Sequence, residues 1–146
     1  MNNEMNITFK SISANEAFAR ISVAAFVSSL DPTLEEINEI KTVVSEAVTN
    51  AIIHGYEENP HQTIAITCTL SEDNLTVIIE DFGLGINNID LAKQPLYTSK
   101  PELERSGMGF TIMENFMDKV EIHSVPDEGT KVTMVKEFKK SKTLCN

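Results

Sequence analysis

Three short motifs lie at the ends of predicted helices and strands, and together they restrict how this chain can fold. Glu46 and Asn50 are four residues apart, so in a helix their side chains share one face. Asp81 ends an apolar run and is followed by Gly83 and Gly85. This pattern predicts a strand that leads into a sharp turn or into a close approach of backbone to a ligand.

The third motif is Gly107-Met-Gly109, which opens an apolar pattern with the period of a helix. Backbone amides at a helix N-terminus bind phosphate through hydrogen bonds and the helix dipole. A carboxylate and a carboxamide on one helix face, an acceptor at a strand end and a phosphate-binding turn are the parts of a nucleotide site. The sequence therefore predicts a fold that brings the three segments together around a nucleotide.

Hydrophobic periodicity predicts about five strands and three main helices. The strands, which alternate apolar and polar residues or are rich in Ile, Thr and Val, are predicted over residues 5–9, 62–70, 74–81, 119–125 and 130–138. The helices are predicted to begin near residues 13, 33 and 107, the first two at capping boxes over 13–16 and 33–36. This grouping predicts an α+β two-layer sandwich, with a mixed, mostly antiparallel sheet and the helices on one face.

Two local predictions concern the helices. In the first helix, Phe18, Ile21, Ala25 and Leu30 are expected to point into the core. The second helix is expected to end at Gly55, with this glycine as the left-handed cap residue.

The length of 146 residues is enough for one domain with a sizeable core, which we expect to span 1–138. Residues 87–106 contain two prolines and no sustained period, which predicts a long loop able to act as a lid. Residues 139–146 are expected to form a flexible tail.

The composition excludes several classes of function. A formal net charge of −10 opposes direct binding to nucleic acid, whose phosphates would repel an acidic surface. No apolar run approaches the roughly 20 residues that cross a bilayer, and the first residues lack the segments of a signal peptide. Cys68 and Cys145 form no disulfide framework. These features predict a cytoplasmic protein, away from membranes, whose acidic surface can attract a basic protein partner.

The motifs together resemble the Bergerat-fold ATP site, which is shared by gyrase-type ATPases, a class of heat-shock chaperones, histidine kinases and MutL proteins. The segments that resemble its N box, two glycine boxes and last turn are Glu46 to Asn50, Asp81-x-Gly83-x-Gly85, Arg105-Ser-Gly107-Met-Gly109 and Gly129-Thr130. Residues 45–55, 95–100 and 105–110 are similar to the anti-sigma factor serine kinases of endospore-forming bacteria.

This resemblance implies that the protein binds ATP and magnesium, holds a sigma factor as a homodimer and phosphorylates a serine of a small anti-anti-sigma protein. It implies that Glu46 acts on the serine hydroxyl as the catalytic carboxylate, Asn50 is the magnesium ligand and Asp81 accepts a hydrogen bond from adenine. The other nucleotide-binding positions that it implies are Gly83, Gly85, Lys100, Arg105, Gly107, Gly109 and Thr130.

Arg20 is a candidate partner contact, because it lies among apolar residues of the first predicted helix and arginine is enriched at interface hot spots. Two other functions stay open at this point. One is a nucleotide-gated binding module in which phosphotransfer is secondary. The other is a stand-alone catalytic domain of a histidine-kinase-like protein, because residues 95–100 also resemble the lid of those enzymes.

Overall fold

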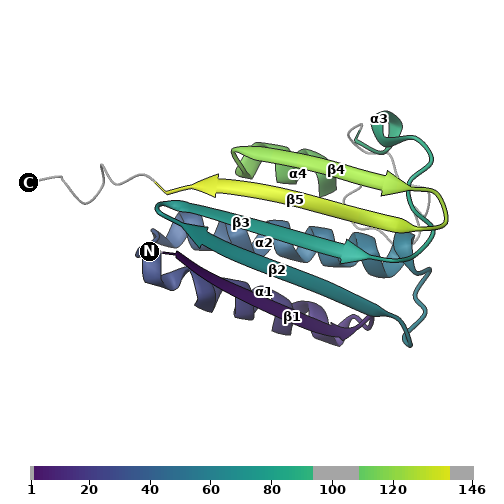
Figure 1. Ribbon diagram of the computed structural model, residues 1–146, viewed down its shortest axis with the longest axis horizontal. Coiled ribbons are helices and arrows are strands. Elements are labelled where there is room, and N and C mark those ends of the chain that lie inside the picture. The colour runs from purple at the N-terminus through teal and green to yellow at the C-terminus, as the bar shows by residue number, and fades with distance from the viewer. Residues whose placement is uncertain (1, 94–108, 139–146) are drawn as a thin grey trace, which may run out of the picture.

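The computed structural model describes residues 2–93 and 109–138, which form a sheet with helices on one side (Figure 1). The strands are β1 (Asn2–Lys10), β2 (Thr63–Ser71), β3 (Asn74–Asp81), β4 (Lys119–Val125) and β5 (Gly129–Glu137). The helices are α1 (Ala14–Val27), α2 (Leu34–Asn50), α3 (Ile89–Ala92) and α4 (Gly109–Phe116). A 3₁₀ turn, η1 (Ser28–Leu30), follows α1, and a π-helical turn, η2 (Ala51–Gly55), follows α2.

The described strands form one sheet in the order β1-β2-β3-β5-β4, and its four neighbouring pairs are all antiparallel. The pairing of β3 with β5 sets Asp81 opposite Thr130. Helices α1, α2 and α4 lie behind the strands in the view of Figure 1. The predicted α+β two-layer sandwich with a mostly antiparallel sheet is therefore confirmed.

The core lies between the inward rows of the strands and the apolar stripe of α2. Ile66 and Met134 from the sheet are fully buried, as are Ile40, Val44 and Val48 from α2. Full burial of such a side chain stabilises the fold by about 1.5–3 kcal/mol relative to exposure. The core therefore fixes α2, which carries Glu46 and Asn50, against the middle of the sheet.

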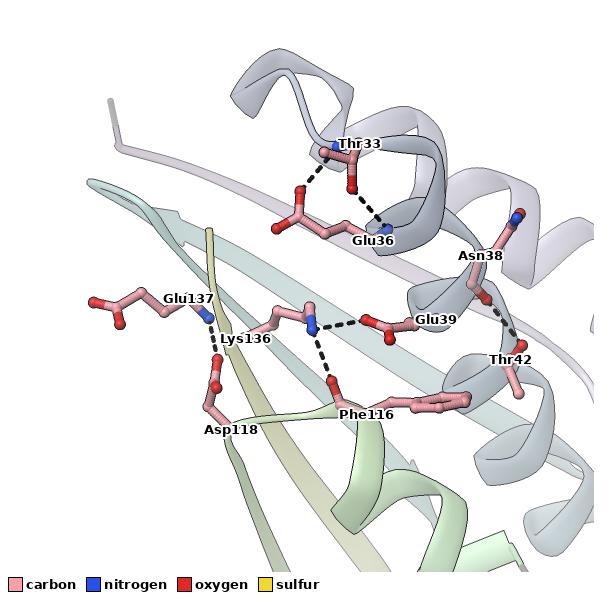
Figure 2. Close-up of polar contacts among 9 residues, drawn as sticks. All are labelled: Thr33, Glu36, Asn38, Glu39, Thr42, Phe116, Asp118, Lys136 and Glu137. Carbon is pink, nitrogen blue, oxygen red and sulfur yellow. Dashed lines mark hydrogen bonds and ion pairs between the residues drawn. The ribbon is translucent and has the colours of Figure 1, made fainter. Parts of the chain in front are cut away.

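The two predicted capping boxes have different outcomes. At the start of α2, Thr33 Oγ1 accepts a bond of 3.1 Å from the Glu36 amide, and Glu36 Oε1 accepts one of 2.8 Å from the Thr33 amide (Figure 2). At the start of α1 the prediction is wrong, because Ser13 has helical dihedral angles and no side-chain cap bond. The Glu16 carboxylate instead accepts a hydrogen bond of 3.0 Å from Arg20 Nη1.

The predicted inward face of α1 is also wrong. Phe18 is 58% exposed and Ile21 59% exposed, whereas Ala19 and Val23 are fully buried. The helix is apolar on more than one side, so its period alone does not select the core face. Small side chains are buried because they allow α1 to approach its neighbours closely. Ala25 is exposed, and of the four predicted residues Leu30 alone packs partly against the core.

Gly55 ends the helical segment as predicted, but not as a left-handed cap. The residues with positive φ after this turn are Glu57, at 51°, and Glu58, at 64°. Gly55 has another reason to be glycine, since a Cβ atom there would lie 2.7 Å from Asp81 Oδ1. A tertiary contact therefore selects the glycine, and the local turn does not.

The first part of the predicted lid contains α3, which Asn88 caps by accepting a hydrogen bond of 3.0 Å from the Leu91 amide. The rest of the predicted lid, 94–106, and the predicted tail, 139–146, lie outside the described residues. Within the described part of the chain, no helix is both long enough and apolar enough to cross a membrane.

Candidate nucleotide site

Three of the sequence motifs meet at one end of the strands, which is called the edge of the sheet below. The C-terminal end of α2, the end of β3 and the start of β5 lie together at the edge near α3 in Figure 1. The first residue of α4, Gly109, lies against Glu46 and Asn50 of α2. Residues far apart in the sequence are thus neighbours here, as the motifs predict.

Asp81 is the buried polar group of this edge, with only 7% of its surface exposed. Burial raises the pKa of its carboxyl group, and backbone hydrogen bonds from Gly83 and Thr130 lower that pKa in opposition. The bond from the Gly83 amide to Asp81 Oδ1 is 3.0 Å long. A carboxylate offers about four lone pairs, so beyond these two backbone donors Asp81 can still accept a hydrogen bond from a ligand that presents an N–H group.

The turn after Asp81 packs directly on the end of the α2 segment. The Leu84 amide donates a hydrogen bond of 2.9 Å to the Gly55 carbonyl. A Cβ atom on Gly83 would overlap that same carbonyl group. Gly85 has a φ of +77°, a conformation that favours glycine. Both predicted glycines of this motif are therefore required by the geometry of the turn.

Tyr56 is a residue of this edge that sequence reasoning missed. Its hydroxyl donates a hydrogen bond of 2.6 Å to the Thr63 carbonyl and accepts one of 2.7 Å from the Phe82 amide. Its ring is buried, and burial raises the pKa of its phenol group. Tyr56 thus ties η2, β2 and the turn after β3 together. Only its position directly after Gly55 could have drawn attention to it.

Thr130 lies beside Asp81 and belongs to a second small network. Its hydroxyl is 2.9 Å from Ser124 Oγ, which also accepts a bond of 2.7 Å from the Ile86 amide. Ser124 was missed as well, because a serine inside a strand carries no distinctive pattern. This network holds the segment after Gly85 against the β4–β5 hairpin.

The other side of the edge is formed by α2 and α4. A Cβ atom on Gly109 would lie 3.1 Å from both Glu46 Oε1 and Asn50 Nδ2, and 3.6 Å from Asn50 Oδ1. The predicted pair therefore does address one spot, directly at the N-terminal end of α4. The described residues contain no cluster of three His, Cys, Asp or Glu side chains that could hold a metal. The carboxamide oxygen of Asn50 fits magnesium, an ion that keeps several waters and takes few protein ligands.

Arg20 lies on α1, where it contacts α2. Its Nη1 donates to Glu16 Oε1 at 3.0 Å and to Ser45 Oγ at 3.1 Å, and Thr49 Oγ1 donates to Glu16 Oε2 at 3.4 Å. Ser45 and Thr49, which take part in this network, directly precede Glu46 and Asn50 in the sequence. The predicted residues Lys100, Arg105 and Gly107 lie outside the described part of the chain.

Comparisons with known proteins show similarity over most of the chain. The family model described as histidine kinase-like ATPase domain matches residues 12–136. A crystal structure of the RsbU and RsbW domains of a Mycobacterium tuberculosis protein has a similar fold, with a TM-score of 0.66 and 17% identity. The match covers 93% of this chain and 32% of that longer chain, and it supports the fold alone.

Closer relatives exist among curated proteins. The anti-sigma F factors of Oceanobacillus iheyensis, Anoxybacillus flavithermus and Bacillus subtilis are 61%, 60% and 59% identical to this chain. Each alignment covers 100% of both proteins. The chain therefore belongs to the histidine kinase-like ATPase family and, within it, to the anti-sigma F factors.

Proposed function

We propose that this protein binds and sequesters a sporulation sigma factor and uses Mg-ATP to phosphorylate a serine of an anti-anti-sigma protein. The observation that carries this proposal is the convergence of Asp81, the pair Glu46 and Asn50, and the Gly109 end of α4 at one edge of the sheet. Membership of the anti-sigma F factor family supports the choice of partners.

In this proposal Asp81 accepts a hydrogen bond from the adenine amino group, with Thr130 beside it. Gly83 and Gly85, which form the turn after Asp81, would let the backbone pass close to the nucleotide. The amides of the second glycine motif meet the phosphates at the helix N-terminus. The residues assigned to the phosphate end are Gly107, Gly109, Lys100 and Arg105.

Asn50 would hold magnesium, which when bound neutralises phosphate charge. Glu46 would accept the proton of the substrate serine hydroxyl. The serine oxygen then bonds to the γ-phosphorus while the bond from that phosphorus to the departing ADP oxygen breaks. The two side chains suit this division of roles because both lie at the same end of α4. A carboxylate can take a proton, whereas a carboxamide cannot.

The test is Glu46→Gln, measured by transfer of labelled phosphate from ATP to the partner protein. We expect a loss of about 10²–10⁴-fold in transfer, as for removal of a general base, with ATP affinity retained. Glu35→Gln is the matched control, since it neutralises an exposed carboxylate on the same helix. Unchanged transfer by Glu46→Gln would exclude the assignment as base. Stable phosphohistidine formed with ATP alone would favour a histidine-kinase-like catalytic domain instead.

Nucleotide-dependent binding of the sigma factor is supported by the network around Glu16. Because Arg20 of α1 donates to Ser45, and Thr49 donates to Glu16 of α1, this helix is linked to the residues that precede Glu46 and Asn50. A shift of α2 on nucleotide binding would reach α1 through these bonds. Equal sigma-factor affinity with ATP, with ADP and without nucleotide would exclude such gating.

We also propose that the protein is a cytoplasmic homodimer without direct contact to nucleic acid. The exposed Phe18 and Ile21 of α1 support a protein interface, because they are three residues apart on one helix face. Arg20, whose side chain is 35% exposed, is the proposed partner contact. The test compares the oligomeric state of the wild type and of Phe18→Ser by sedimentation, and we expect the variant to dimerise less. A purely monomeric wild type would contradict the proposal.

A further inference from the structure

Lys136 is a charged residue in an inward row of β5. Val132 and Met134, four and two positions earlier, are 5% and 0% exposed. Side chains at every second position of a strand share a face, so Lys136 continues this buried row, and its side chain is only 13% exposed. An ammonium group in such a place requires partners, because burying an unpaired charge is costly.

Figure 2 shows the two partners, which come from different helices. Lys136 Nζ donates a hydrogen bond of 2.8 Å to the carbonyl oxygen of Phe116, the last residue of α4. It also pairs with Glu39 Oε1 of α2 at 3.0 Å. The last carbonyl groups of a helix have no partner within the helix and carry partial negative charge, so an ammonium group is favourable there. Lys136 therefore joins the C-terminal end of α4 to α2.

The opposite end of α4 meets the candidate site. Gly109 and Phe116 are seven residues apart in α4, and Glu39 and Glu46 are seven residues apart in α2. At 1.5 Å per residue, both spans are about 10 Å long. Since Gly109 lies against Glu46 and Phe116 is linked to Glu39, the two helices run antiparallel with contacts at matching intervals.

Apolar contacts between the helices impose no donor–acceptor geometry, because the hydrophobic effect is not directional. A hydrogen bond depends steeply on distance and angle. We propose that Lys136 is a positioning residue, which sets where α4 lies along α2 and so holds Gly109 at its distance from Glu46 and Asn50. This inference rests on the proposed function, because it assumes that the Gly109 end of α4 meets the phosphates of ATP.

The experiment compares ATP with AMP, which keeps the adenine but lacks the β- and γ-phosphates. In Lys136→Met we expect the ratio of ATP to AMP affinity to fall about 10-fold, and kcat for phosphotransfer to fall about 10- to 100-fold, as for small displacements of catalytic groups. AMP affinity should not change. Lys131→Met, on the same strand but with a side chain 47% exposed, is the matched control and should behave as the wild type. Lys136→Arg should recover most of the ratio, since guanidinium can donate to both partners.

An unchanged ratio and kcat in folded Lys136→Met would overturn the inference, and so would equal losses of ATP and AMP affinity, which indicate general destabilisation. If Lys136→Met does not fold, the ratio of ATP to AMP affinity is measured in Glu39→Ala instead. This variant removes the link from Lys136 to α2 and keeps the contact of Lys136 with Phe116. A wild type that binds no ATP would overturn the proposed function as well. Normal ATP binding by the wild type with an unchanged ratio in the variants overturns the positioning role alone.

Discussion

The two ends of the candidate site are built in different ways. At the Asp81 end, main-chain groups contact each other directly, as in the bond from the Leu84 amide to the Gly55 carbonyl, and Tyr56 joins three segments. At the α4 end, the nearest atoms that a Cβ on Gly109 would meet are the tips of the Glu46 and Asn50 side chains. Side-chain tips can rotate away, whereas a packed backbone has to move as a whole. We therefore expect changes at the first end to alter folding and affinity, and changes at the second to alter catalysis.

The largest effect is expected from Gly83→Ala. The new Cβ atom would overlap the Gly55 carbonyl, which is main chain and cannot rotate away. Overpacking of this kind costs about 1–3 kcal/mol and occasionally more, so both the free energy of unfolding and ATP affinity should fall. Urea denaturation and calorimetric titration measure the two quantities. Wild-type values in both would contradict the rigid description of the Asp81 end.

Tyr56→Phe should have the next largest effect on stability. It leaves the Phe82 amide and the Thr63 carbonyl without the hydroxyl that now bonds to both. Loss of a partner from buried polar groups costs about 1–3 kcal/mol, which a shift in the urea midpoint would reveal. AMP should lose as much affinity as ATP, since the adenine end is affected. A loss of affinity for ATP but not for AMP would contradict the proposed difference between the two ends of the site.

Gly109→Ala should have a smaller effect on stability and a clear effect on rate. Its Cβ atom would lie 3.1 Å from Glu46 Oε1 and from Asn50 Nδ2, so both side chains have to move slightly. A small displacement of catalytic groups lowers kcat by about 10-fold or more, while the urea midpoint should stay near that of the wild type. Steady-state kinetics with separate kcat and KM values provide the measurement. A loss of stability as large as that of Gly83→Ala would contradict the description of the α4 end as the more adaptable of the two.

The smallest expected effect is the pH dependence that Asp81 adds to the nucleotide-free protein. Burial raises the pKa of Asp81, so the native state binds this proton more tightly than the unfolded chain does. Stability should therefore fall as the pH rises from the ordinary aspartate pKa of about 3.9 through the raised value, and then level off.

Asp81→Asn does not titrate in this range, and it provides the comparison. Its free energy of unfolding minus that of the wild type should increase as the pH rises above the ordinary aspartate pKa of about 3.9, because only the wild type loses a favourable proton. Urea denaturation at several pH values measures this difference. A difference that stays constant, or that decreases with pH, would contradict the raised pKa.

Much of the fold follows from local patterns. The hairpin of β2 and β3 lies within one residue of its predicted bounds, since alternating Ile, Thr and Val residues favour strands. The capping box of α2 is confirmed because its two hydrogen bonds join residues three positions apart, and nothing distant is needed. The site motifs were found for a similar reason. Each consists of a short spacing whose geometry is defined by one helix or one turn.

Sequence alone thus predicted the five strands, the three main helices, the fold class and the candidate site residues Glu46, Asn50, Asp81 and Gly109, because their patterns are local. The tertiary structure decided which face of α1 is buried, why Gly55 is a glycine, and that Tyr56 and Lys136 join distant segments. These features depend on contacts between residues far apart in the chain, and a periodic pattern carries no information about them. The same division applies to Lys136, whose charge is plain in the sequence but whose partners exist only once α2, α4 and β5 pack together.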